Sequence, residues 1–150
     1  MNTKPLKVLL ADDDNDDCLF FKNAIAQLPI ATDLNAVHDG EQLIRHLVQN
    51  PERMPDVIFL DLSMPRKTGF ECLTEIKQNP HWKNIPVFVF STSFTKDLNY
   101  ERNLIGTLSM IGAEEYIRKP GDFEQLKQVI HKALLNVTAD KSIKLSGTAL

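Results

Sequence analysis

The sequence contains little cysteine, no excess of basic residues and no long apolar run. Its two cysteines, Cys18 and Cys72, form no CxxC pair and are too few for a disulfide framework, so a reducing cytoplasm is the expected location. Acidic residues outnumber Lys and Arg by 20 to 17, which argues against non-specific binding to nucleic acid or to a membrane surface. No apolar stretch is long enough to cross a bilayer, and residues 1–10 are too short for a signal peptide. Secreted disulfide-rich, membrane-spanning and basic nucleic-acid-binding classes are therefore excluded.

Short apolar runs alternate with amphipathic helical patterns along the chain. Strands are expected at residues 6–11, 33–38, 56–62, 85–93 and 114–120. Helices are expected at residues 14–28, 39–50 and 95–112, and from Gly69 and Asp122 onward. Because several of these strands are apolar on both faces, they predict a parallel sheet with helices on both sides. The fold class is thus α/β, a doubly wound, flavodoxin-like, five-stranded parallel sheet in the order 2-1-3-4-5.

The length of the chain fits one domain, which we expect to occupy residues 1–137. The polar segment 138–150 is expected to be a mobile or loosely packed tail, and no output domain is expected. The helical segment before the last strand has five apolar residues that we expect in the core: Leu98, Leu104, Ile105, Leu108 and Ile111.

The stretch "ADDDNDD" places acidic residues directly after the first apolar strand. Because ligands of doubly wound sheets bind outside the carboxyl ends of strands 1 and 3, Asp12 and Asp13 should meet Asp61. Carboxylates without His or Cys suit Mg²⁺, or Mn²⁺ in its place. Asp16 and Asp17 are interpreted as stabilising a helix N-terminus. An EF-hand loop starting at Asp12 is excluded, because its required Gly and Glu are absent.

Two more polar residues follow strands on the same edge. Ser91 ends the fourth strand and Lys119 ends the fifth. A hydroxyl and an ammonium beside carboxylates and Mg²⁺ are typical of a phosphoryl site, in which Asp61 would be the nucleophile. Lys119 would supply a positive charge and Ser91 a hydrogen bond.

Taken in order, these motifs resemble those of the response regulator receiver domain family, the CheY-like phosphoacceptors of bacterial two-component signalling. The segments that carry the resemblance are "VLLADDD", "VIFLDLSMPRKTG", "PVFVFSTS" and "YIRKP", within residues 6–137. The resemblance implies that Asp61 is phosphorylated and that Asp12, Asp13, Asp61 and the backbone carbonyl of Ser63 bind the metal ion.

The same resemblance implies roles for residues around the acceptor. Ser91 matches the switch hydroxyl, Tyr116 the switch aromatic residue and Lys119 the phosphate-binding lysine. Structural roles are implied for Pro65, for Gly69, which opens the following helix, and for Pro120. The Lys119–Pro120 bond resembles a cis peptide of the family, although trans is the default from sequence.

The implied function is that of a single-domain response regulator. A histidine kinase or phosphotransfer protein would present a phosphohistidine, and Asp61 would take the phosphoryl group in a Mg²⁺-dependent step. The change would act on the face built from the fourth helix, fifth strand and fifth helix, which would bind an unknown downstream protein or a second copy of the chain. The chain would catalyse only its own phosphorylation and dephosphorylation.

The sequence leaves two alternatives open. One is a pseudo-receiver that binds partners without phosphorylation, although its usual mark is loss of the acceptor, the acids or the lysine. The other is a Mg²⁺-dependent phosphohydrolase of the haloacid-dehalogenase type, whose DxDx(T/V) motif is matched by Asp12 and Asp14 but not by Asp16. Turnover of phosphate esters would distinguish the second alternative. The segment between Ser91 and Lys119 is also longer than is usual in the family, by about two helical turns at most.

Overall fold

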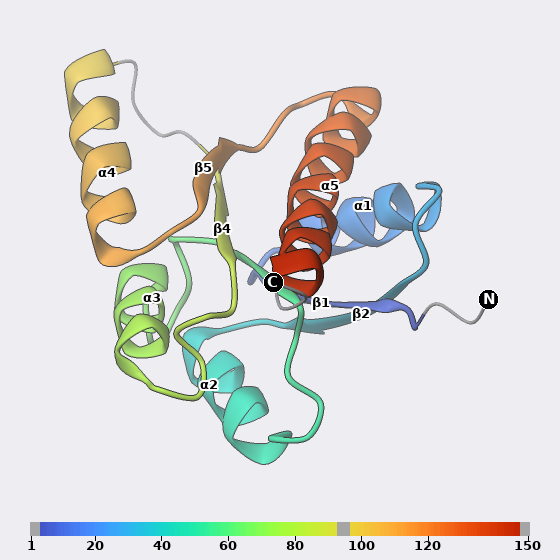
Figure 1. The fold of residues 1–150 in the computed structure, drawn as a ribbon. Coiled ribbons are helices and arrows are strands. Elements are labelled where there is room, and N and C mark those ends of the chain that lie inside the picture. The colour runs from blue at the N-terminus through green and yellow to red at the C-terminus, as the bar shows by residue number, and fades with distance from the viewer. Residues whose placement is uncertain (1–3, 93–96, 148–150) are drawn as a thin grey trace.

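The computed structural model describes residues 4–92 and 97–147, with the backbone alone described for residues 140–147. Five parallel strands form one sheet in the order β2-β1-β3-β4-β5, as predicted (Figure 1). The strands are β1 (Leu6–Ala11), β2 (Thr32–Val37), β3 (Val57–Leu60), β4 (Val87–Ser91) and β5 (Glu115–Arg118). The helices in the described ranges are α1 (Asn15–Ala26), α2 (Gly40–Gln49), α3 (Gly69–Gln78), α4 (Leu98–Ile111) and α5 (Phe123–Gly147).

Helices cover both faces of the sheet, so the sheet separates two apolar cores (Figure 1). Alternate side chains of β1 enter opposite cores: Val8 and Leu10 face α1 and α5, whereas Leu9 and Ala11 face α2 and α3. Phe59 of β3 packs edge-on against Phe21 of α1, with ring centroids 5.0 Å apart. Full burial on both faces explains why these strands are continuous apolar runs.

β1 ends at Ala11 as predicted, whereas the other four strands end before their predicted carboxyl ends. β3 ends at Leu60 rather than Leu62, because the Leu62 carbonyl accepts a hydrogen bond from the N–H of Gly69 (3.1 Å) instead of continuing the ladder. The predicted fourth strand extended to Ser93, and the predicted fourth helix began at Thr95; both residues lie outside the described ranges. The chain therefore leaves the sheet just where its polar residues begin.

The predicted core set of α4 is partly wrong. Leu108 is buried in the core on the α2–α3 side of the sheet, and Leu104 and Ile111 are partly buried against the same core. Leu98 and Ile105 are exposed instead, by 67% and 41%. Residues 104, 108 and 111 share one face of the helix, and Leu98 and Ile105 lie outside that face.

The last helix continues past the end of the predicted domain. α5 runs to Gly147, so residues 138–147 are helical where a loose tail was expected. The helical spacing of apolar residues in the sequence ends at Val137, but Ala, Lys and Leu are good helix formers and favour continuation of the helix. None of the helices in the described ranges is both long and apolar enough to cross a bilayer.

Candidate functional site

The acidic end of β1 lies beside the end of β3. The two strands pair with Ala11 opposite Leu60, so Asp12 and Asp61 each follow directly after a paired residue. One oxygen from each of Asp12, Asp13 and Asp61 lies within 4.8 Å of the others. Asp12 and Asp61 are buried, with 1% and 6% of their surface exposed, whereas Asp13 is exposed. The strand order thus brings together the three carboxylates that the sequence places at strand ends.

This donor set consists of oxygen atoms alone. Mg²⁺ is bound in proteins by one or two carboxylates together with water and phosphate oxygens, and Mn²⁺ accepts the same ligands. Within the part of the chain that the structure describes, it is the one group of three such side chains close enough to hold a metal ion. The residues present therefore fit Mg²⁺ or Mn²⁺, and the lack of His or Cys disfavours zinc.

Lys119 reaches the carboxylates from the end of β5. Its Nζ lies 2.6 Å from Asp12 Oδ2, 2.9 Å from Asp17 Oδ2 and 3.4 Å from Asp61 Oδ2. Burial alone would lower the pKa of Lys119, but the hydrogen bonds to Asp12 and Asp17 raise it above its usual range. Burial raises the pKa of Asp12 to about 6, against the lowering effect of Lys119. One ammonium thus serves several acids, which leaves the site with a net negative charge suited to a cation.

The second oxygen of Asp61 is held by hydrogen bonds. Ser91 Oγ donates to Asp61 Oδ1 at 3.0 Å, and the N–H of Ser63 donates to the same oxygen at 3.2 Å. Ser91 is 1% exposed, so its hydroxyl needs this hydrogen-bond partner inside the protein. The N–H of Lys119 donates to the Ser91 carbonyl (3.0 Å), which keeps the ends of β4 and β5 side by side. Hydroxyl, ammonium and carboxylate therefore surround one aspartate.

The loop between β3 and α3 approaches Asp61 closely. A Cβ on Gly69 would lie 2.4 Å from the Asp61 carbonyl oxygen, so only glycine fits at the start of α3. Thr68 caps this helix in a reciprocal capping box with Glu71. Pro65 lies exposed in the same loop. These contacts explain the Gly69 position that the sequence motif singled out.

The cis peptide suggested for Pro120 is not found. The described residues contain no cis peptide, so the Lys119–Pro120 bond is trans. Trans is the lower-energy form of an X–Pro bond. Lys119 Nζ reaches Asp12 and Asp17 in this geometry.

Tyr116 lies on β5 next to α4 and is partly buried. Burial raises the pKa of Tyr116, and the Glu101 carboxylate adds to this effect while Arg118 opposes it. Glu101 of α4 forms an ion pair with Arg118 of β5. The tyrosine therefore sits where α4 and β5 are held together, with its ring at the edge of the core.

Sequence reasoning missed the contribution of Asp17. It was interpreted as a helix-stabilising acid, yet its carboxylate binds Lys119, whereas the side chain that caps α1 is that of Asp14. The N–H of Asp17 donates to Asp14 Oδ1 (3.0 Å), which fixes the first turn of α1 against the site. Asp16 is exposed, and its side chain has no partner among the described residues. The signal available was the place of Asp17 in the helical turn that follows strand β1.

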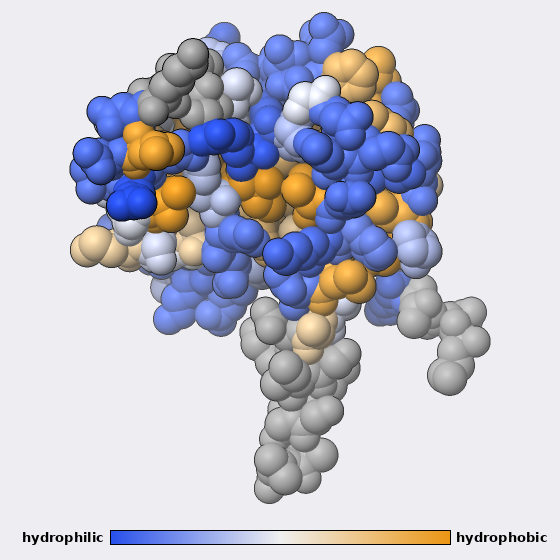
Figure 2. All heavy atoms as spheres, turned by 90° about the horizontal axis from the view of Figure 1, so that it is seen from above, coloured by the Kyte–Doolittle hydropathy of each residue, from blue (hydrophilic) through white to orange (hydrophobic). Residues whose placement is uncertain are grey.

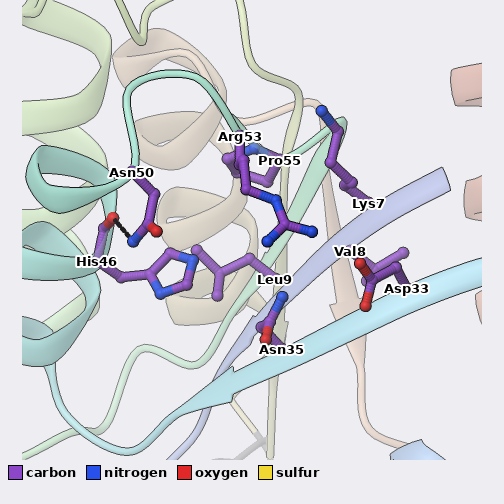
Figure 3. Close-up of a pocket in the computed structure, with 9 residues that line it drawn as sticks. All are labelled: Lys7, Val8, Leu9, Asp33, Asn35, His46, Asn50, Arg53 and Pro55. Atoms are coloured by element: carbon purple, nitrogen blue, oxygen red, sulfur yellow. Dashed lines mark hydrogen bonds between the residues drawn. The ribbon is translucent and has the colours of Figure 1, made fainter.

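A separate polar cavity of about 300 Å³ opens at the other end of the sheet (Figure 3). Its lining residues, drawn in Figure 3, are Lys7, Val8, Leu9, Asp33, Asn35, His46, Asn50, Arg53 and Pro55. Lys7 and Asp33 pair near the amino ends of β1 and β2. Lys7 is five residues before Asp12 along β1, which separates the cavity from the acidic site by roughly 17 Å. Its lining mixes both signs of charge, and none of its residues belongs to the acidic site.

Comparison with known sequences identifies the family of the chain. Residues 8–131 match the model of the response regulator receiver domain. Response regulator Rcp1 of Synechocystis sp. is 37% identical over 97 residues, which cover 62% of this chain and 66% of Rcp1. A probable cyclic di-GMP phosphodiesterase of Vibrio cholerae is 33% identical over 129 residues, which cover 86% of this chain but 26% of that protein. The chain therefore spans only part of the length of these relatives.

Two solved structures of response regulators have the same fold. The phosphorylated cyanobacterial phytochrome response regulator RcpA superposes with a TM-score of 0.76 at 30% identity, covering 87% of this chain and 91% of RcpA. The Mn²⁺-bound form of Rcp1 superposes with a TM-score of 0.73 at 29% identity, covering 85% and 91% of the two chains.

Proposed function

Since the chain belongs to the response regulator receiver domain family, we propose that it accepts a phosphoryl group on Asp61 in a Mg²⁺-dependent step. The donor is a phosphohistidine of a histidine kinase or phosphotransfer protein. The observation that carries this proposal is the convergence on Asp61 of Ser91, Lys119 and two further carboxylates. The chain is a phosphoacceptor of the cytoplasm that catalyses only its own phosphorylation and dephosphorylation, not an enzyme acting on other substrates.

The chemistry is an in-line displacement at phosphorus. A carboxylate oxygen of Asp61 attacks, a phosphorus–oxygen bond forms, and the phosphorus–nitrogen bond breaks with its electron pair leaving on the histidine imidazole. Lys119 Nζ, 3.4 Å from Asp61 Oδ2, is close enough to bind an oxygen of the transferred group. Ser91 Oγ, which donates to Asp61 Oδ1, is placed to donate to the phosphoryl group instead.

Asp12, Asp13 and Asp61 would hold the metal ion, together with the Ser63 carbonyl implied by the family motif. Mg²⁺, or Mn²⁺ in its place, supplies positive charge that stabilises the phosphoryl oxygens in the transition state. The Mn²⁺ bound by the related Rcp1 supports this assignment.

Phosphorylation is proposed to change the face formed by α4, β5 and α5. Movement of Ser91 towards the phosphoryl group leaves space beside Tyr116, whose ring lies at the α4–β5 contact. Four large apolar or aromatic side chains of α4 are already exposed: Leu98, Tyr100, Ile105 and Met110. Figure 2 shows hydrophobic surface in orange on the left of the molecule, the side on which Figure 1 places α4. These residues suit a downstream protein or a second copy of the chain.

Intact mass spectrometry tests the proposal. The protein is incubated with acetyl phosphate, with and without Mg²⁺, as wild type and as Asp61→Asn. We expect one phosphoryl adduct that requires Mg²⁺ and is absent from the variant. An adduct that survives in Asp61→Asn would place the acceptor elsewhere, and no adduct with any donor would favour a pseudo-receiver. Steady release of phosphate from phosphate esters would instead favour a phosphohydrolase.

A further inference from the structure

Lys119 and a bound metal ion require the same carboxylates. Asp12 Oδ2 is the nearest partner of Lys119 Nζ, at 2.6 Å, and Asp61 Oδ2 lies at 3.4 Å. Both aspartates also belong to the group of three that would bind Mg²⁺. A divalent cation on Asp12 repels the ammonium, so Lys119 must give up this partner when metal enters.

Asp17 is the partner of Lys119 that lies outside the metal-binding group. Its Oδ2 is 2.9 Å from Lys119 Nζ, and its side chain is 37% exposed at the rim of the site. The lysine side chain is 11% exposed, so its ammonium needs a polar partner wherever it moves. The hydrogen bond from the Asp17 N–H to Asp14 Oδ1 holds Asp17 in the rigid first turn of α1.

We infer that Asp17 is a positioning residue that retains Lys119 at the rim when Asp12 and Asp61 bind Mg²⁺. By giving the ammonium another partner, Asp17 reduces the cost of metal entry. It also keeps the ammonium near Asp61, where the phosphoryl group forms. The inference rests on the proposed function, because it assumes that the three carboxylates bind Mg²⁺.

Calorimetric titration of Mg²⁺ into the full chain tests the inference, with Asp16→Asn as the matched control. Both substitutions remove one negative charge from the first turn of α1, but only Asp17 contacts Lys119. We expect Asp17→Asn to weaken Mg²⁺ binding about tenfold, as substitutions of residues that orient metal ligands do. Asp16→Asn should change it by about twofold at most, the effect of a screened surface charge. Asp17→Glu, which keeps the carboxylate, should recover most of the loss.

A double-mutant cycle with Lys119→Met separates positioning from simple charge. Lys119→Met removes the competing ammonium and should bind Mg²⁺ more tightly than wild type. In that background Asp17→Asn should cost no more than Asp16→Asn. Equal losses for Asp16→Asn and Asp17→Asn in the wild-type background, or an Asp17→Asn loss that persists without Lys119, would overturn the inference.

The wild-type arm distinguishes failure of the inference from failure of the proposed function. If wild type binds Mg²⁺ and forms the Asp61 adduct while Asp17→Asn behaves like Asp16→Asn, the inference alone is wrong. If wild type binds no Mg²⁺ and forms no adduct, the inference and the proposed function both fail.

Discussion

The carboxyl group of Asp12 is buried and faces both the Lys119 ammonium and the Asp61 carboxylate. Burial favours its neutral form more than Lys119 favours its charged form, so the pKa of Asp12 is raised from 3.8 to about 6. The folded protein therefore binds a proton at Asp12 more tightly than the unfolded chain does. The stabilisation from this proton is complete below about pH 4 and is lost as the pH rises through about 6.

Asp12→Asn removes this titration and keeps the size of the side chain. The quantity to compare is the free energy of unfolding of wild type minus that of Asp12→Asn. We expect this difference to fall as the pH rises from about 4 to about 6 and to stay level at higher pH. Urea denaturation followed by circular dichroism, in metal-free buffer at a series of pH values, measures the difference. A difference that stays level over this range, or rises with pH, would contradict the raised pKa.

The sequence is informative about single residues wherever a strand position decides where a side chain lies. Asp12, Asp61 and Lys119 each directly follow a strand and Ser91 ends one, and parallel strands bring their carboxyl ends to one edge. Asp17 escaped this reasoning because it lies on a helix, and its contact depends on how α1 is rotated against β5. That rotation is set by tertiary packing and by the Asp14 cap, which local sequence patterns do not reveal.

The start of α2 shows how a helix terminus depends on one small residue. A Cβ on Gly40 would lie 2.1 Å from the Lys67 carbonyl oxygen in the β3–α3 loop. The same loop is tied to α2 by Arg66, whose Nε lies 3.6 Å from Asp39 Oδ2 and whose φ is 70°. Close approach of these backbones thus supports the loop that follows Asp61.

Gly40→Ala is expected to lower the free energy of unfolding by about 1–3 kcal/mol, because the added methyl group overpacks a backbone contact. Gly106 is the matched control, since it lies in α4 and a Cβ there would meet nothing within 4 Å. Gly106→Ala should raise stability by about 0.5–1 kcal/mol, because alanine favours a helix interior. Urea unfolding curves measure both changes, and destabilisation by both substitutions to the same extent would contradict the close contact at Gly40.

The orientation of α4 is a second property of an element that sequence alone predicted incompletely. Apolar residues occur all around this helix, so their spacing cannot tell which stripe meets the sheet. Contact with α3 and β5 decides it, burying Leu108 and leaving Leu98 exposed. The surplus apolar residues then form the exposed surface proposed for partner binding.

Leu108→Ala and Leu98→Ala test this orientation with the same chemical change. Leu108→Ala should cost about 2–5 kcal/mol, since it leaves a cavity in the core between α4 and the sheet. Leu98→Ala should change stability by about 0.5 kcal/mol or less, because its side chain is 67% exposed. Thermal and urea unfolding give both values, and similar losses for the two variants would mean that α4 is rotated differently.

At the scale of the whole molecule, the sheet has two ends with different polar groups. The carboxyl ends of the strands carry the acidic site, and the amino ends carry the cavity lined by Lys7 and Arg53. The strand order could be predicted because right-handed crossovers and buried parallel strands allow few arrangements. The extent of α5 could not, because no apolar pattern continues past Val137 to mark it.

The separation of these two ends of the sheet predicts which segments respond to phosphorylation. Ser91 and Tyr116 lie on β4 and β5, so a signal from Asp61 should reach α4 and β5 before it reaches the amino ends of the strands. Hydrogen–deuterium exchange is measured with acetyl phosphate and Mg²⁺. We expect changed exchange in residues 97–118 and unchanged exchange in residues 50–55 at the distant cavity.

Asp61→Asn with the same additions is the control, because it is exposed to the same reagents but lacks the proposed acceptor. Exchange in residues 97–118 of Asp61→Asn should be the same with and without acetyl phosphate and Mg²⁺. If the change in wild type were instead centred on residues 50–55, or appeared equally in Asp61→Asn, the signal would not pass through Ser91 and Tyr116. The α4–β5–α5 face would then lose its assignment as the surface that phosphorylation controls.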